Sequence, residues 1–247
     1  LTTGARNTGV GQNSLGEVTT ADDNTGLGQD SLGAATTGSE NTAVSKSLTS
    51  CTTGSGNTAA GFNSLNAVSS GGNNLGLGKD AGRTGSPGGN ITSASNIIAL
   101  GDENVTNAHI QVDWTVASDV RDKTDFEPLD LGLNFVKSLN AFTYKWDKRS
   151  NYGDKSAEDY DLNAQSPDGT HKEDWLDIGF KAQEVEALEI AAGYNKSSKT
   201  NLVSSHTDDG MQMGLRYSKF VPILVKAIQE QQEIIDALTA RLDAAGL

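Results

Sequence analysis

The first 84 residues of the chain repeat a short pattern at nearly constant spacing, and this limits how the chain can fold. Each copy opens with Asn, usually followed by Thr, then by a small or apolar pair and in most copies by a glycine. The opening residues lie 17, 17, 16 and 17 positions apart: Asn7, Asn24, Asn41, Asn57 and Asn74. Self-similarity at a fixed period is typical of stacked structural units. We therefore expect an ordered array and not a disordered Gly/Ser/Thr linker, which needs no internal period.

Each copy is consistent with one or two short strands joined by glycine turns. It offers two or three aliphatic side chains, which we expect to be too few to bury the face of one chain. A homotrimeric all-β shaft, similar to a β-roll or β-prism, would supply the missing surface, because three chains would pool their small inward residues around a common axis. Residues 4–84 resemble the "NTAxG"-type repeats of trimeric phage fibres and bacterial adhesin heads. This resemblance implies an architecture and names no ligand.

Composition divides the chain into two unlike parts. Residues 1–117 contain only two aromatic residues, Phe62 and Trp114, whereas the remainder carries the Tyr, Trp, Phe and Leu that build an ordinary core. We therefore predict a boundary near residues 110–118. A net charge of −13 argues against a nucleic-acid partner, which would need a surplus of Lys and Arg.

Several other classes of function are disfavoured as well. No apolar run is long enough to span a membrane. A single cysteine, Cys51, excludes an internal disulfide framework and a cysteine-based zinc site. The histidines His109, His171 and His206 are scattered without ligand spacing, so we expect no metal site and no cofactor.

A half-buried strand is predicted over residues 109–116, because Ile110, Val112, Trp114 and Val116 alternate with polar or small residues. It leads into the motif S-D-x-R-x-K, formed by Ser118, Asp119, Arg121 and Lys123. Three further blocks follow in order: an aliphatic helix at 132–139 with a strand at 142–146, the segment 178–184, and the terminal segment from Tyr217 to 230. Together these blocks, which span residues 113–243, resemble the peptidase S74 family of self-cleaving intramolecular chaperones at the C-terminal ends of phage tail fibres and tailspikes.

The resemblance implies that the chain is cut between Ala117 and Ser118. Ser118 would attack the preceding carbonyl, and Lys123 would be the base that activates its hydroxyl, with Asp119 and Arg121 in support. Ser118 and Lys123 are five residues apart, so on an extended segment they face opposite sides. A turn between them, or pairing across subunits, is therefore required. Taken alone, the motif also suits a solvated turn with ordinary ion pairs, and the three further blocks favour the family.

The C-terminal segment 218–243 is predicted to be a long helix with a heptad seam. The seam residues are Leu224, Ile228, Gln231, Ile235, Leu238 and Leu242. Gln231 would form a polar layer that fixes register and chain number at some cost in stability. The pattern favours a three-stranded coiled coil, and a simple amphipathic core helix is the alternative.

These observations predict three domains: a repeat shaft over 1–90, a β linker over 91–117, and an α+β chaperone domain over 118–247 that ends in the coiled-coil helix. The resemblance implies the C-terminal part of a viral tail fibre or tailspike, located in the virion and assembled in the host cytoplasm. Its last residues would assemble a homotrimer and then release themselves in one autoproteolytic turnover. The chain itself is thus the expected partner, and a host-surface glycan or receptor is a further candidate partner of the shaft.

Two other functions remain open at this stage. One is a permanent trimeric cap of a fibre or adhesin, without proteolysis. The other is a glycan-degrading tailspike, which needs two carboxylates at a cleft. The repeats supply only scattered acidic residues for the second: Asp22, Asp23, Asp30 and Glu40.

Overall fold

The computed structural model describes residues 3–155, 157, 159–194 and 202–246. They form two compact units, each built from separate stretches of the chain. The shaft unit comprises Leu1–Ala108, Trp146–Glu173 and His206–Gln212. The helical unit comprises His109–Lys145, Asp174–Ser205 and Met213–Leu247. The predicted boundaries of contiguous domains, at residues 90 and 117, stay predictions.

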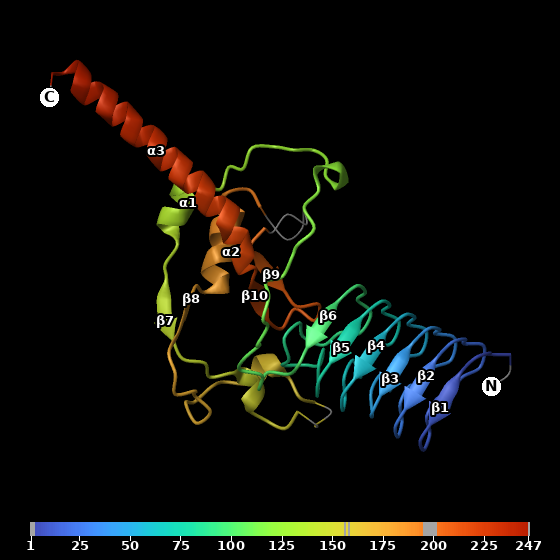
Figure 1. Ribbon diagram of the computed structural model, residues 1–247. Helices are drawn as coiled ribbons and strands as arrows, with labels where there is room; N and C mark the ends of the chain where they lie inside the picture. The colour runs from blue at the N-terminus through green and yellow to red at the C-terminus, as the bar shows by residue number, and fades with distance from the viewer. Residues whose placement is uncertain (1–2, 156, 158, 195–201, 247) are drawn as a thin grey trace. The chain divides into compact units, whose positions relative to one another are not determined.

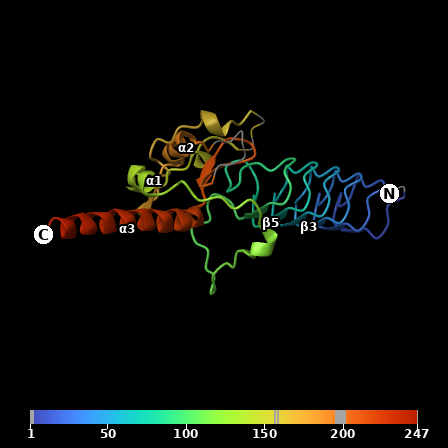
Figure 2. The same cartoon turned by 90° about the horizontal axis from the view of Figure 1, so that it is seen from above.

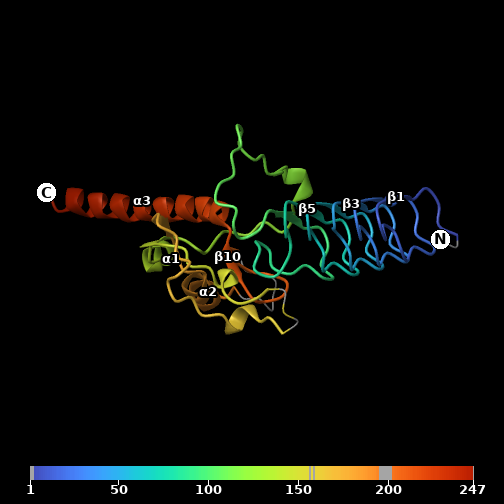
Figure 3. The ribbon, with the colours of Figure 1, turned by 90° about the horizontal axis from the view of Figure 1, so that it is seen from below.

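The shaft unit is a β-solenoid in which each repeat contributes one strand to a parallel sheet (Figure 1). The sheet follows sequence order, and Thr8, Thr25, Thr42 and Thr58 pair directly with one another along it. Successive coils stack behind the strands (Figures 2 and 3). The strands are β1 (Thr8–Val10), β2 (Thr25–Leu27), β3 (Thr42–Val44), β4 (Thr58–Ala60), β5 (Leu75–Leu77) and β6 (Ile98–Leu100).

The solenoid encloses an apolar core within one chain, so the expectation that a single chain cannot bury this face is wrong. The coils place a few leucines and small or branched residues on the inside, and equivalent residues stack from coil to coil. A narrow interior therefore needs few aliphatic side chains per repeat. The buried core residues are Val18, Ala21, Leu32, Ala35, Ala43, Leu48, Cys51, Ala59, Leu65, Val68, Ala81, Ile91 and Ala99.

A ladder of buried asparagines holds neighbouring coils together. The amide oxygen of Asn24 accepts the backbone N–H of Asn41 at 2.9 Å, and Asn41 does the same for Asn57 at 2.9 Å. The side-chain nitrogen of Asn41 donates to the carbonyl of Gly54 at 2.8 Å. Each asparagine thus satisfies backbone groups that lie inside the solenoid, away from water. This explains why Asn opens every copy of the repeat.

We expect Asn41→Ala to lower the free energy of unfolding by roughly 2–4 kcal/mol, because it leaves the buried N–H of Asn57 without its acceptor and leaves the carbonyl of Gly54 with only the weak thiol donor of Cys51. Urea unfolding of the variant and the parent measures this change. Gln29→Ala removes an exposed amide and is the control, with an expected change within about 0.5 kcal/mol. Equal midpoints for all three proteins would contradict the ladder's role.

Close approach between coils requires glycine after several strands. Gly28 has φ 129°, and a Cβ there would lie 2.9 Å from the backbone of Ser45. Ser45 itself, the exception to the glycine pattern, has φ 71° in the shortened third copy. Leu32, Leu48 and Leu65 also adopt left-handed backbone, with φ of 52°, 50° and 48°. Their complete burial offsets the cost of that conformation, about 1 kcal/mol or more each.

Cys51 occupies the interior position that Ala35 and Val68 fill in neighbouring coils. Burial raises the pKa of its thiol to about 11. The reactive thiolate is therefore scarce at neutral pH, and the sulfur is shielded from solvent. We expect a maleimide to leave Cys51 unmodified in the folded chain and to label it within minutes after denaturation. Rapid labelling of the folded protein, measured by mass spectrometry, would contradict its place in the core.

Among its described residues, the helical unit contains three α-helices, short 3-10 turns and short strands. α1 (Leu133–Ser138) precedes β7 (Phe142–Tyr144), which pairs antiparallel with β8 (Asp177–Gly179). α2 (Ala182–Ala191) follows, and β9 (Ser204–His206) pairs with β10 (Met213–Leu215). α3 (Phe220–Ala244) ends the chain as the predicted long helix. None of the described helices is long and apolar enough to cross a bilayer.

One face of α3 packs into the hydrophobic core of this unit. Its core contains Leu131 before α1, Phe135 of α1, Val185 of α2, and Phe220 and Ile223 of α3. A carboxylate on the same helix helps to hold α1, since Glu230 accepts the N–H of Leu133 at 2.7 Å. This hydrogen bond lowers the pKa of Glu230.

The predicted strand over residues 109–116 is absent. The segment is not part of any sheet in the described structure, and Val112, Trp114 and Val116 are 72%, 73% and 79% exposed. The alternation of apolar residues is present in the sequence, but no strand of the described chain pairs with it. An alternating pattern predicts which side chains a strand would bury. A strand also needs a neighbouring strand to pair with, and the pattern does not show whether one is present.

Candidate autocleavage site and chaperone domain

A single 3-10 turn sets the geometry of the predicted cleavage site. The turn spans Val120–Asp122, and Asp119 caps it by accepting the backbone N–H of Arg121 at 2.9 Å. Asp at such a position is favoured because its short side chain reaches the free N–H groups that open the turn. The turn reverses the chain and thereby supplies the bend that the sequence spacing requires.

The turn brings Ser118 and Lys123 together. The Nζ atom of Lys123 donates a hydrogen bond to Oγ of Ser118 at 2.6 Å. Both residues are exposed, as is Ala117 on the other side of the candidate scissile bond. The short distance is within the range in which a base can take a proton from a serine hydroxyl.

Asp119 and Arg121 form a two-pronged ion pair beside this contact. Nε and Nη2 of Arg121 donate to the two carboxylate oxygens of Asp119, at 3.0 and 2.6 Å. The side-chain hydrogen bonds from Arg121 lower the pKa of Asp119, and the same hydrogen bonds raise the pKa of Arg121. Arg121 therefore holds the side chain of Asp119 at the start of the turn.

Comparison with known protein families matches this part of the chain. Residues 118–194 match the family model described as "Peptidase_S74: Chaperone of endosialidase". The match begins at Ser118. The chain carries an S74 chaperone domain. No curated protein and no solved structure matches the chain.

The predicted seam of α3 lies on the helix face that this unit leaves open. Gln231 is exposed, and the exposed fractions of Leu224, Ile228, Ile235, Leu238 and Leu242 lie between 44% and 65%. The face used within the chain carries Phe220, Ile223 and Ala227, which are buried. One chain thus uses one side of α3 for its own core and leaves the seam without cover in the described structure.

Two stretches of the C-terminal half pack within the shaft unit, which sequence reasoning did not find. The carboxylate of Asp209 accepts the backbone N–H of Asn90 at 2.7 Å. Lys148 donates to the carbonyl of Glu103 at 2.8 Å and forms an ion pair with Glu173 at 2.7 Å. Lys155 forms a second ion pair, with the side chain of Glu103. These contacts join residues 146–173 and 206–212 to the last coil of the solenoid.

Arg149 connects these two stretches by hydrogen bonds. Its guanidinium donates to the carbonyl of Met211 at 2.6 Å and to the side chain of Asn163 at 2.8 Å. One arginine therefore fixes the 206–212 loop against residues 161–164. The acidic sequence around residues 154–177 gave no sign of this arrangement, because charge-rich stretches commonly form solvated loops.

Glu189 is a second important residue that the sequence did not reveal. It is completely buried on α2, and its carboxylate accepts the backbone N–H groups of Leu202, Val203 and Ser204, the last two at 2.7 and 2.9 Å. These bonds stabilise the buried charge and fix the start of β9. A glutamate on an amphipathic helix usually lies in solvent, so no sequence signal indicates this role.

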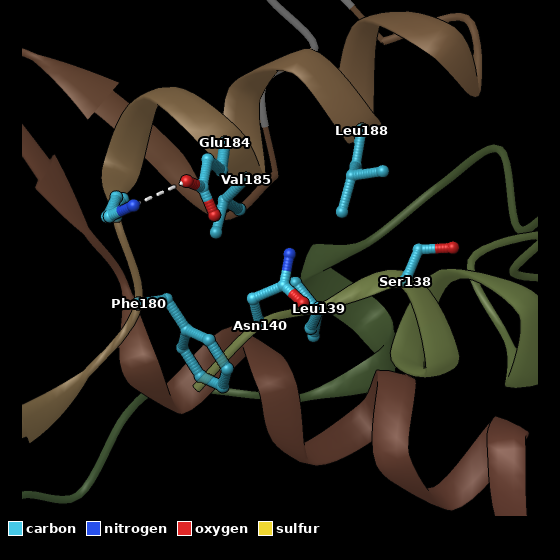
Figure 4. A pocket seen from close by; sticks show the side chains of 8 residues that line it. Ser138, Leu139, Asn140, Phe180, Glu184, Val185 and Leu188 are labelled. Atoms are coloured by element: carbon cyan, nitrogen blue, oxygen red, sulfur yellow. Dashed lines mark hydrogen bonds and ion pairs between the residues drawn. The ribbon is translucent and has the colours of Figure 1, made fainter. Parts of the chain in front are cut away.

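A shallow hollow lies between the end of α1 and the start of α2 (Figure 4). Ser138, Leu139 and Asn140 line one side, and Phe180 and Leu188 line the other. Lys181 and Glu184 form an ion pair at 2.8 Å at the first turn of α2, and both residues also line the hollow. Ser118 and Lys123 do not line this hollow, so it is separate from the cleavage site. Among the described residues, no cluster of three or more His, Cys, Asp or Glu could hold a metal ion.

Proposed function

We propose that residues 118–247 assemble three copies of a viral tail fibre or tailspike and then release themselves by cleaving the bond between Ala117 and Ser118. The contact of Lys123 with Ser118, at the first residue of the matched chaperone domain, carries this proposal. The family of the domain supports both parts, chaperone activity and self-cleavage. The seam of α3 supports three copies as the assembled state.

The reaction follows from the groups at the turn. The neutral amine of Lys123 takes the proton from Oγ of Ser118, and Oγ attacks the carbonyl carbon of Ala117. The C–N bond breaks as the new C–O bond forms, and the proton passes to the amine of Ser118. Water then hydrolyses the ester, which leaves a carboxylate on Ala117 and restores the hydroxyl. Asp119 and Arg121 position the turn and do not take part in proton transfer.

Exposure of the site suggests when the reaction takes place. Ser118 and Lys123 are exposed to solvent in a single chain, and an amine acts as a base only in its neutral form. Assembly would cover the turn and the exposed apolar side chains of residues 110–116, and would favour the neutral amine. Cleavage would then follow assembly, so the chaperone domain would be released only after the three chains have assembled.

The contacts at the end of the solenoid support the chaperone role. Unpaired coil ends expose backbone groups and apolar surface, so repeat proteins need a cap. Residues 146–173 and 206–212 cover the last coil through Asp209, Lys148 and Arg149. A docked coil can serve as the first ordered unit on which the remaining coils stack, which lowers the entropic cost of starting the array.

Mass and sedimentation of the purified chain test the proposal. We expect two fragments under denaturing conditions, residues 1–117 and 118–247, and a trimer in solution before cleavage. A trimer that keeps a 25.8 kDa chain after long incubation would overturn self-cleavage and support a permanent cap. A monomer that is never cut would overturn both parts.

We expect Asp209→Ala to speed hydrogen exchange at the amide of Asn90 by roughly 10- to 100-fold, because a hydrogen bond to a charged acceptor contributes about 1.5–3 kcal/mol. Exchange mass spectrometry of peptides that cover residues 85–105 measures the effect. Asp208→Ala removes a neighbouring exposed carboxylate and should leave the exchange unchanged. Equal exchange in both variants would contradict the docking of this loop on the coil.

The same contact has a defined pH range. Burial would raise the pKa of Asp209, but hydrogen bonds from Thr207, Asn90 and Met211 outweigh it and hold the pKa below its ordinary value. A lowered pKa in the folded state means that the stabilisation is fully present above the ordinary value, about 3.9, and is lost as pH falls through the lowered one. Protection of Asn90 should therefore not change between neutral and mildly acidic pH.

A further inference from the structure

The outer side of the solenoid sheet is a ladder of uncharged side chains. In each strand the middle residue faces inward, so the first and third residues face outward. Val10, Leu27, Val44 and Leu77 stack at the third position, with exposed fractions between 40% and 61%. We call the twelve outward residues the sheet face: Thr8, Val10, Thr25, Leu27, Thr42, Val44, Thr58, Ala60, Leu75, Leu77, Ile98 and Leu100.

The absence of charge on the sheet face contrasts with the rest of the chain. The sequence holds 19 basic and 32 acidic residues, yet the twelve positions are four threonines and eight aliphatic residues. The charges of the array lie in the turns, where Lys46 and Asp30 pair across coils at 3.6 Å. Parallel sheets are normally covered on both faces, whereas Leu27, Val44 and Leu77 of this face are 40–41% exposed in the described chain. We therefore expect another protein surface to cover the sheet face.

We propose that the sheet face packs against the same face of two further copies of this chain. The inference deepens the proposed function and rests on its trimer. The side chains repeat at the spacing of neighbouring strands, about 4.8 Å, over a length of about 24 Å. A partner that fits must present apolar side chains at that same spacing, and a second copy of the ladder does so.

Electrostatics favours the same partner and the same face. Each chain carries a net charge of −13, so copies repel one another over most of their surface. The sheet face adds no like charge where the copies meet. Figure 1 shows the six strands side by side, with no other segment of the shaft unit interposed in their ladder.

The sheet face is too small to hold three chains together without a second interface. Three residues span about 10 Å, so the face measures about 240 Å², well below the roughly 800 Å² per partner of a stable interface. The exposed seam of α3 is the second apolar surface on the same chain. Chains held together at one surface meet at the other with a raised effective concentration, which allows a small interface to form.

Cysteine cross-linking in the full chain tests the inference. Leu77→Cys and, separately, Leu27→Cys are placed in a Cys51→Ala background and treated with a short bismaleimide. Ser70→Cys, at an exposed position of a turn outside the sheet, is the matched control. We expect both face variants to yield mainly doubled species that contain residues 1–117, and the control to yield less than about a tenth as much.

Sedimentation of the same samples separates the outcomes. A trimer that cross-links at neither Leu27 nor Leu77 overturns the inference and leaves the proposed function intact. A trimer that cross-links equally at Ser70 also overturns it, because contact is then not confined to the sheet face. A monomer overturns the proposed trimer and this inference with it.

Discussion

Replacing Ser118 by Ala, or Lys123 by Arg, is expected to leave the whole chain at 25.8 kDa under denaturing conditions, whereas the parent is cut into two fragments. Ser118→Ala removes the oxygen that attacks the carbonyl of Ala117. Lys123→Arg keeps a hydrogen-bond donor beside Ser118, but a guanidinium does not lose its proton in proteins and cannot act as a base. Mass spectrometry after long incubation measures the uncut fraction.

The arginine variant separates a base from a residue that only positions Ser118. If Lys123 only held the hydroxyl in place, Lys123→Arg would retain much of the cleavage, and this result would contradict the proposed mechanism. Ser118→Cys keeps a nucleophile and should still be cut, through a thioester. Lys137→Ala, at an exposed lysine of α1, is the control and should be cut like the parent. Sedimentation should show that every variant still assembles, since none of them changes the seam of α3.

The repeat could be predicted from the sequence, but its core could not. Spacing of the asparagines sets the register, and the structure pairs Thr8, Thr25, Thr42 and Thr58 as that spacing requires. The error was to count only large aliphatic residues as core. Alanine, cysteine and hydrogen-bonded asparagine fill much of this narrow interior, and their burial follows only once the coil is closed.

The candidate cleavage motif could be found from neighbouring residues in the sequence, whereas contacts between distant residues could not. The motif identified Ser118 and Lys123 as candidate residues, and the need for a turn between them followed from strand geometry; their roles in cleavage stay predictions. Sequence could not predict that Asp209 binds the backbone of Asn90, 119 positions away, or that Glu189 binds three N–H groups that lie 13 to 15 positions further along the chain. Such contacts depend on how loops return to one another, and a single sequence carries no periodic signal for that.

Two aspartates in the seam of α3, Ile228→Asp and Leu238→Asp, are expected to convert the trimer to a monomer at micromolar concentration. Both side chains are exposed in one chain and would be buried between helices in the assembly. Each loss of an apolar contact is worth about 2 kcal/mol, and a trimer contains six of them. The total of about 12 kcal/mol corresponds to roughly eight to nine powers of ten in the association constant, before any cost of burying the charges.

The matched control adds the same charge on the opposite side of the helix, at Gln229→Asp and Ala240→Asp, which are both exposed. It should remain trimeric, so that a monomer in the seam variant cannot be attributed to charge alone. The cleavage assay on the same two proteins then tests the order of events. If assembly creates the water-poor setting in which Lys123 acts as a base, the seam variant will stay uncut while the control is cut. A seam variant that is monomeric and still fully cut would show that one chain contains a complete cleavage site. Covering of the turn by neighbouring copies would then have no part in the mechanism.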